Sequence, residues 1–346
     1  MTKLAIAIPT YNRAHLLQNR LKEFINFKRY VDEMWIADNS DSAWEGFAGP
    51  EHSNAIKYVH NSFNIGGGAN FLKVLTLGSS AYVWLRGDDD PITLKQVEAV
   101  SAAIKDSPDI IILSRNATKP ELISNIRQFF DRFNISQASG WISMCVFKQT
   151  SLSKGLQSGY WGVHTGWPHF ALLLGIFQHS KSVSCLIYPI SLEYRDFREE
   201  GRSTRKWSII KTCVDNFPSS FELINDNCVR RYAYYQWRKN QSFNLVRSFV
   251  RSRLGLSPFE SVSLKTISNL LSITNPRSSM ICFALLIFSM IPRTILTLVF
   301  AYMLELIPYK KLILLELTDL HQLKPIDRYL LMTKLQRKQK ASCAFV

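Results

Sequence analysis

Three consecutive aspartates, Asp88, Asp89 and Asp90, follow the apolar run 82–85. Carboxylates packed this closely repel one another, and a divalent cation would relieve that repulsion. Because side chains alternate along an extended chain, we expect Asp88 and Asp90 to point to one side and Asp89 to the other. Such oxygen ligands suit Mg²⁺ or Mn²⁺, and the cation could hold a diphosphate. The alternative is an acidic turn in which Asp90, before Pro91, caps the next helix.

Three polar segments precede the aspartates, and each of them also follows a short apolar run. Residues 10–13 open a helical pattern, and residues 38–42 combine acids and amides that can pair with a nucleobase edge or a ribose. Residues 64–70 contain three glycines, which let backbone approach a ligand before a helix begins. Ligands of open α/β sheets bind outside the carboxyl ends of the strands. Each segment alone could be an ordinary turn, but together they predict a site for a nucleotide diphosphate.

Alternating strand and helix patterns would position these segments. We predict strands over 4–8, 34–37, 56–59, 81–85 and 110–113, and helices over 14–26, 68–77 and 93–105. Consecutive units of this kind indicate an α/β fold around a mostly parallel sheet. Two further β-prone runs, 141–147 and 183–190, flank a stretch rich in glycine and tryptophan. We expect this stretch, around 160–167, to be a substrate-facing loop.

The four segments, taken in order, resemble the successive motifs of family 2 glycosyltransferases. These enzymes have a GT-A fold, use nucleotide sugars and invert the anomeric centre. The resemblance rests on 9–13 (Pro-Thr-Tyr-Asn-Arg), 38–40 (Asp-Asn-Ser), 64–67 (Asn-Ile-Gly-Gly) and 88–90 (Asp-Asp-Asp). It implies a GT-A catalytic domain over 1–200, and a site in which Thr10 and Arg13 flank the nucleotide, Asp38 contacts the base, and Asp88 and Asp90 form the metal site. The predicted donor site is completed by Asn39, Asn64, Gly67 and Asp89.

The segments 87–90 and 166–169 are most similar to those of a bacterial O-antigen subgroup that includes abequosyltransferases. This similarity implies transfer of a 3,6-dideoxyhexose such as abequose from a CDP-sugar to a hydroxyl of a lipid-linked (polyprenyl diphosphate) oligosaccharide. The product would serve O-antigen and lipopolysaccharide synthesis. Alternatives are a rhamnosyl or hexosyl donor, a polyprenyl-phosphate glycosyl synthase, or a membrane-bound scaffold with an inactive transferase fold.

The catalytic base is not fixed by these motifs. Many family members carry a Glu-Asp pair before a helix, and no such pair occurs between residues 140 and 182. His169 precedes a helical run in the corresponding region, and histidine has an intrinsic pKa suited to general-base catalysis. Its alternative role is packing at a helix start. Glu193 and Asp196 are rival bases, and His164 is a weaker candidate.

Composition and charge describe the rest of the chain. Hydrophobic residues make up 47% of the 346, which excludes intrinsic disorder, and 42 basic against 27 acidic residues give a net charge of +15. The excess lies mostly beyond residue 194. We therefore predict a helical basic region over 201–275 and a membrane-associating region over 276–346. The cations within 195–207 could form a lid, or a solvated loop.

Residues 280–304 are strongly apolar but are interrupted by Pro292 and Arg293. About 20 continuous apolar residues span a bilayer, so this segment suits a monotopic hairpin, a single span or buried core helices. Flanking cations suit anionic headgroups. We expect a peripheral or monotopic protein on the cytoplasmic face of the bacterial inner membrane. Nucleic acid is not an expected partner, because acids at the strand ends would repel phosphate in the absence of metal.

Overall fold

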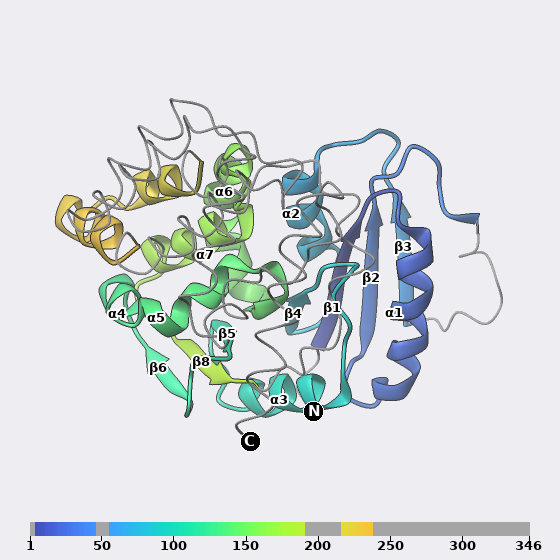
Figure 1. Cartoon of the computed structure of the whole chain (residues 1–346), viewed down its shortest axis with the longest axis horizontal. Helices are drawn as coiled ribbons and strands as arrows, with labels where there is room; N and C mark the ends of the chain where they lie inside the picture. Colours follow the sequence, from blue (N-terminus) through green and yellow to red (C-terminus); the bar gives the residue numbers. More distant parts are fainter. Residues whose placement is uncertain (1–3, 46–54, 191–215, 238–346) are drawn as a thin grey trace, which may run out of the picture. The chain divides into compact units, whose positions relative to one another are not determined.

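The computed structural model describes residues 4–45, 55–190 and 216–237 of the chain (Figure 1). All of them except Trp237 belong to one compact unit. The predicted lid over 195–207, the parts 201–215 and 238–275 of the predicted basic region, and the predicted membrane-associating region 276–346 lie outside the described residues. Within the described ranges, no helix combines the length and the apolar character that crossing a membrane requires.

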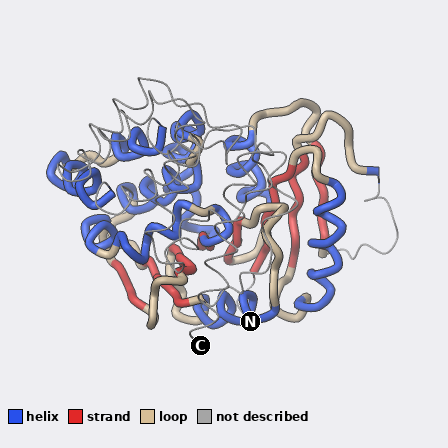
Figure 2. The backbone as a smooth tube through the Cα atoms, viewed as in Figure 1, coloured by secondary structure: helices blue, strands red, loops and turns tan. Residues whose placement is uncertain are grey.

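Eight strands form one mixed sheet, drawn in red in Figure 2. The spatial order of the strands is β3-β2-β1-β4-β7-β5-β8-β6. The pairs β1–β2, β2–β3, β1–β4 and β5–β8 are parallel, and those made by β7 and β6 are antiparallel. The strands are β1 (Leu4–Thr10), β2 (Glu33–Asp38), β3 (Ile56–His60), β4 (Tyr82–Leu85), β5 (Ile110–Ser114), β6 (Glu121–Ile123), β7 (Cys145–Lys148) and β8 (Cys185–Pro189).

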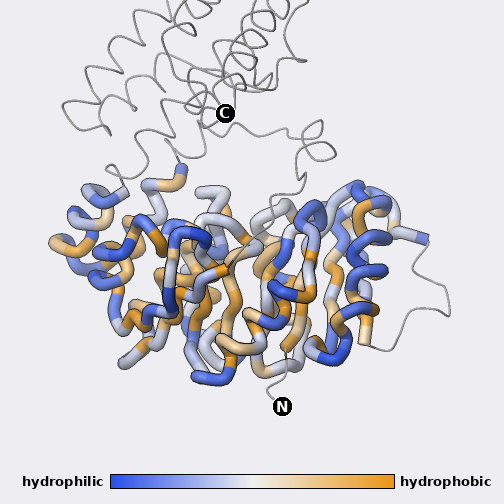
Figure 3. The backbone as a smooth tube through the Cα atoms, turned by 60° about the horizontal axis from the view of Figure 1, so that its bottom comes forward, coloured by the Kyte–Doolittle hydropathy of each residue, from blue (hydrophilic) through white to orange (hydrophobic). Residues whose placement is uncertain are grey.

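Helices cover both faces of this sheet. Helices α1 (Ala14–Phe27) and α3 (Leu94–Ile104) bury an apolar stripe against one face, whose core contains Leu17, Phe24 and Val97 beside Ile6 and Trp84. Helix α2 (Gly67–Leu77) packs on β1, β2 and β4, and contacts α6 (Gln149–Trp161) and α7 (Pro168–His179). All residues of β1, β4 and β5 are buried. Figure 3 colours the backbone by hydropathy and shows apolar residues within the interior of the described region. The predicted strands and helices over 4–113 are therefore confirmed.

The stretch around 160–167, predicted as a substrate-facing loop, is helical instead. It comprises the end of α6, the 3₁₀ helix η4 (Gly162–Thr165) and the turn into α7. Glycines allow this arrangement because α6 and α7 touch backbone to backbone. A methyl group added at Gly155 would lie 2.3 Å from the carbonyl oxygen of Leu172, and one at Gly162 would lie 2.2 Å from Cβ of Ala171.

Short elements complete the described region. The predicted strand over 141–147 is shortened to β7, because residues 142–144 wind into a 3₁₀ turn before it. A cluster of phenylalanines, including Phe129, Phe170 and Phe221, joins these elements to α7. The elements are α4 (Ile126–Asp131), α5 (Phe133–Ser136), η2 (Gln137–Gly140), η3 (Ile142–Met144), η7 (Phe217–Leu223) and a helix over 227–237.

Candidate active site

The four sequence segments meet at the carboxyl ends of the parallel strands. In the strand register, Thr10 at the end of β1 pairs with Asp38 at the end of β2. The hydroxyl of Thr10 donates a 2.7 Å hydrogen bond to Asp88 Oδ2, beyond the end of β4. Gly66 and Gly67 open α2 at the same edge, following β3. The predicted convergence of these segments is therefore present in the fold.

The aspartates do not continue the strand. Asp90 donates its backbone N–H to the carbonyl of Gly87 at 3.2 Å, so the chain turns after Arg86. A methyl group in place of a Gly87 hydrogen would lie 3.0 Å from both Asp89 Oδ1 and Asp90 Oδ2. These two carboxylates thus converge over one backbone atom. The alternation that placed Asp88 and Asp90 on one side assumed an extended chain, which this turn is not. Their assignment as the metal pair stays a prediction, and Asp89 and Asp90 are the two carboxylates that approach each other over Gly87.

Asp88 has a different environment from its two neighbours. Its side chain is 7% exposed, and Oδ1 accepts a 2.8 Å hydrogen bond from the Arg13 guanidinium. Arg13 also lies 3.4 Å from Asp89 Oδ2. Burial raises the pKa of Asp88, and Arg13 and Thr10 oppose that rise. Both carboxylate oxygens of Asp88 are therefore already bound by protein donors.

The alternative of an acidic helix cap is wrong. Helix α3 begins at Leu94 with Thr93 as its N-cap, and Thr93 and Gln96 form a reciprocal capping box. Buried Arg86 holds the aspartate turn through the carbonyls of Asp90 and Pro91, at 3.2 and 2.5 Å. Helix capping therefore does not occupy the aspartates.

Ser143 supports this turn from η3. Its hydroxyl donates to Asp90 Oδ2 and accepts the backbone N–H of Gly87 at 2.9 Å. Burial lowers the pKa of Arg86 to about 10, which still leaves the guanidinium charged at neutral pH. A buried cation and a hydroxyl thus fix the turn that carries Asp89 and Asp90.

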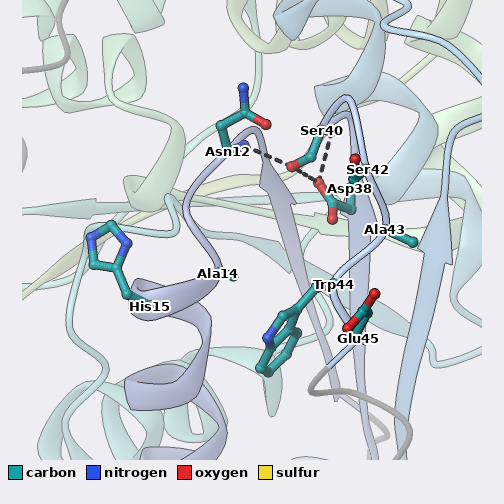
Figure 4. A pocket seen from close by; sticks show the side chains of 9 residues that line it. All are labelled: Asn12, Ala14, His15, Asp38, Ser40, Ser42, Ala43, Trp44 and Glu45. Atoms are coloured by element: carbon teal, nitrogen blue, oxygen red, sulfur yellow. Dashed lines mark hydrogen bonds between the residues drawn. The ribbon is translucent and has the colours of Figure 1, made fainter.

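A pocket of about 550 Å³ opens beside Asp38, between the segments that follow β1 and β2 (Figure 4). Asp38 is buried, and its Oδ1 accepts hydrogen bonds from the backbone and hydroxyl of Ser40. Its Oδ2 accepts the Tyr58 hydroxyl at 2.6 Å. One lone pair on Oδ2 remains for a further donor such as a base N–H. The lining residues are Asn12, Ala14, His15, Asp38, Ser40, Ser42, Ala43, Trp44 and Glu45.

Asn39 and Asn64 serve a network of asparagine side chains. Asn39 donates to Asn64 at 2.7 Å and accepts from Asn61 at 2.8 Å, and Asn61 also donates to Asn70. Asn64 further accepts the backbone N–H of Gly66 at 2.8 Å. Buried Asn39 thus fixes the glycine segment. A methyl group added at Gly67 would meet no described atom within 4 Å, so the backbone is open on that side.

His169 does not occupy the position expected of a general base. Its side chain is 1% exposed in the first turns of α7, and neither ring nitrogen completes a hydrogen bond with any described residue. Burial lowers its pKa to about 4, which the nearby backbone of Gly140 and Ser139 only partly offsets. Packing near Trp167, whose ring centroid lies 6.0 Å away, fits the alternative role. Glu193 and Asp196 lie outside the described residues and remain predictions.

Several residues of the site had no usable signal in the sequence. Trp44 and His15 line the pocket, but each follows a predicted motif rather than belonging to it. Tyr58 lies inside a strand, and Ser143 is distant from the aspartates along the chain. Arg86 stands two residues before the first aspartate, and its position next to an acidic turn was the one available hint.

The carboxylate oxygens of the aspartate turn suit a hard divalent cation as ligands. Asp89 and Asp90 offer two converging carboxylates, and such oxygen ligands bind Mg²⁺ or Mn²⁺ together with phosphate oxygens. Among the described residues, no group of three or more histidine, cysteine, aspartate or glutamate side chains could hold a metal ion. A cation at this turn would therefore depend on ligands supplied by the bound diphosphate or by water.

Comparison with known proteins defines the class. Residues 5–174 match the family described as Glycosyl transferase family 2. The chain therefore contains a family 2 glycosyltransferase domain and is a glycosyltransferase. Its fold is GT-A-like, with a mostly parallel mixed sheet between layers of helices.

Among individual relatives, the chain is similar to abequosyltransferase RfbV of Salmonella typhimurium. The two are 22% identical over 257 residues, which cover 64% of this chain and 74% of the relative. A crystal structure of S. aureus TarS 1-349 aligns with 99% of this chain and 92% of its own, at 12% identity and a TM-score of 0.47. The structure of mannosyltransferase PcManGT from Pyrobaculum calidifontis, in complex with GDP-Man and Mn²⁺, aligns with 85% of this chain and 87% of its own. The identity is 15% and the TM-score is 0.45.

Proposed function

We propose that this glycosyltransferase moves a sugar from a nucleotide sugar to a hydroxyl of a lipid-linked oligosaccharide, with inversion, during synthesis of a bacterial O-antigen. The similarity to an abequosyltransferase favours a 3,6-dideoxyhexose carried by CDP. The observation that carries the proposal is the meeting of the Asp38 pocket and the aspartate turn at one edge of the sheet. A nucleotide sugar requires a pocket for its nucleobase beside a site for its diphosphate.

The predicted donor residues beside the Asp38 pocket and in the aspartate turn have a place in this proposal. Asp38 would accept a base N–H through its remaining lone pair, while Thr10 and Arg13 hold Asp88 beside the turn. Asp89 and Asp90 would hold Mg²⁺ or Mn²⁺. The chemistry that such a cation supplies is neutralisation of charge on the departing nucleoside diphosphate.

Transfer also requires a base that removes the acceptor hydroxyl proton. Of the predicted candidates, burial disfavours His169, and we propose Glu193 or Asp196 for this role. The inner-membrane surface is the proposed location, since the acceptor is a lipid. A rhamnosyl or hexosyl donor remains the second candidate for the same site.

The test is donor hydrolysis by purified full-length protein with Mn²⁺ or Mg²⁺. CDP-, dTDP-, UDP- and GDP-sugars would be compared by release of the nucleoside diphosphate. We expect slow release from one donor class, lost in Asp90→Asn and retained in Asp106→Asn, which changes an aspartate beyond the end of α3. Failure with every donor, by protein that folds normally, would refute the proposal.

A further inference from the structure

Arg13 occupies the position of a counter-cation within the aspartate turn. One guanidinium nitrogen lies 2.8 Å from Asp88 Oδ1 and 3.4 Å from Asp89 Oδ2, so the group bridges two carboxylates. Asp88 is almost fully buried, whereas the Arg13 side chain is 23% exposed and that of Asp89 is 36% exposed. The contact to Asp89 is therefore the longer and more solvated of the two, and the easier to exchange.

The surrounding charges leave little net attraction for a cation while Arg13 is in place. Two further guanidinium groups, Arg20 and Arg86, are buried close enough to the aspartates to interact with them electrostatically. Glu23 ion-pairs with Arg20 at 3.1 Å. Within the described part of the chain, the four carboxylates of Glu23 and the aspartate turn thus face the three guanidinium groups, which leaves one net negative charge there. If Arg13 turns away, that excess becomes two negative charges, which matches a divalent cation.

We propose that Arg13 is an internal counter-cation that a divalent metal ion displaces from Asp89, and that the released guanidinium then binds the diphosphate of the donor. This inference rests on the proposed function. Arg13 is the residue that precedes α1, outside the regular helix, so its side chain can move without unwinding a turn. Guanidinium groups pair with phosphate as readily as with carboxylate.

The exchange couples two ligands. Metal alone must compete with Arg13 for Asp89 and gains no replacement partner for the guanidinium. Metal with a nucleoside diphosphate satisfies both the carboxylates and Arg13. Metal binding should therefore be weak without nucleotide and strong with it. Removal of Arg13 should strengthen metal binding in the absence of nucleotide and weaken nucleotide binding in the presence of metal.

Binding of Mn²⁺ to nucleotide-free protein tests the inference. Free Mn²⁺ would be measured by electron paramagnetic resonance for wild type, Arg13→Gln and Arg13→Lys. We expect Arg13→Gln to bind Mn²⁺ alone roughly fivefold or more tightly, because a competing charge within contact distance is removed. The same variant should bind CDP and UDP more weakly at saturating Mn²⁺. Arg13→Lys, which keeps the charge but loses the fork of donors, should fall between.

Arg29→Gln is the matched control, since it removes one exposed arginine just beyond the other end of α1. It should leave Mn²⁺ affinity unchanged. In an Asp89→Asn background, the gain from Arg13→Gln should disappear, and a persisting gain would show a general charge effect and overturn the inference. Thermal unfolding of each variant would verify that it is folded.

The results separate this inference from the proposed function. If wild type binds a nucleoside diphosphate in a Mn²⁺-dependent way, but Arg13→Gln binds Mn²⁺ alone no more tightly, Arg13 is not a displaceable cation and the proposed function stands. If wild type shows no metal-dependent nucleotide binding, both proposals fail.

Discussion

The hydroxyl of Tyr58 donates a 2.6 Å hydrogen bond to Asp38, from β3 to the end of β2. The same hydroxyl accepts the backbone N–H of Trp44 at 2.8 Å. The Tyr58 hydroxyl thus connects Asp38, the predicted contact to the nucleobase, to Trp44, which lines the pocket. Burial, followed by the bond to Asp38, raises the pKa of Tyr58 to about 12, so this donor stays protonated at physiological pH.

Replacing Tyr58 with phenylalanine should weaken nucleotide binding. The change removes the donor to Asp38 and the acceptor for Trp44, so we expect affinity for nucleoside diphosphate to fall several-fold and stability to fall by about 1 kcal/mol. Calorimetric titration and urea unfolding would measure these effects. Tyr30→Phe is the control, because Tyr30 also donates to a carboxylate, that of Glu98, but before β2 begins. Equal nucleotide affinity in the two variants would contradict the prediction.

The sequence predicts the sheet well because its strands are short, apolar and separated by clear helix patterns. It also places the polar segments at one edge, since parallel strands end together. The orientation of the aspartates was not predictable in the same way. Alternation assumes an extended chain, and the turn after Arg86 depends on Ser143, which is distant in sequence. Contacts of this kind leave no local pattern.

The helical stretch 160–167 and His169 show a related limit. Tryptophans beside glycines suggest an exposed loop, but here the glycines allow α6 to pack against α7. His169 follows a proline at a helix start, as a functional residue can. Only the tertiary packing shows that its ring is buried. The residues next to a single polar side chain in the sequence do not show whether that side chain is buried.

His169→Asn tests the consequence of that burial. The ring is neutral in the fold, with a pKa of about 4 against an ordinary value of 6.5. A lowered pKa in a basic group stabilises the fold fully above pH 6.5, and that contribution is lost as pH falls toward 4. We expect wild type to lose up to about 3 kcal/mol over this range from His169, at about 1.4 kcal/mol per pKa unit. Urea unfolding between pH 8 and 5 should show a flatter profile in the variant.

The pH dependence of activity gives the second measurement for His169. Because the ring does not reach solvent, the variant should keep the wild-type pH–rate profile, even if its rate is lower. A limb near neutral pH that disappears only in His169→Asn would identify His169 as the base and contradict this expectation.

Glu33 should contribute stability without affecting the site. It lies at the start of β2, where Oε1 accepts the backbone N–H groups of Ser79 and Ser80 at 2.7 and 2.8 Å, and Oε2 accepts the Trp35 indole at 2.9 Å. Burial acts to raise its pKa, but these hydrogen bonds outweigh burial and the net direction is downward. The ionised form therefore stabilises the fold above about pH 4.5. That contribution is lost as pH falls through the lowered pKa.

Glu33→Gln should cost about 2 kcal/mol at pH 7, the range for hydrogen bonds to a charged group. The difference from wild type should shrink at pH 3, and nucleotide affinity at pH 7 should be unchanged. Urea unfolding at both pH values checks the first result and titration with nucleotide the second. A stability difference that is equal at the two pH values would show that ionisation of Glu33 is not its source.

Gly155→Ala tests whether the helix pair positions the glycine segment. The new methyl group would lie 2.3 Å from the carbonyl of Leu172, so α6 and α7 must separate, at a cost of about 1–3 kcal/mol. A methyl group added at Gly68, in the first turn of α2, would lie 3.2 Å from Val163 in η4 and 3.5 Å from Pro168 at the start of α7. Separation of the pair therefore reaches the segment that begins α2.

We accordingly expect Gly155→Ala to lower both the urea midpoint and the affinity for nucleoside diphosphate. Gly67→Ala is the control for stability alone: its methyl group meets no described atom within 4 Å, and alanine favours a helix over glycine. That variant should match or slightly exceed wild-type stability. If Gly155→Ala loses stability but binds nucleotide as wild type does, the helix pair supports the fold without positioning the donor site, because a displacement at α7 then fails to reach α2.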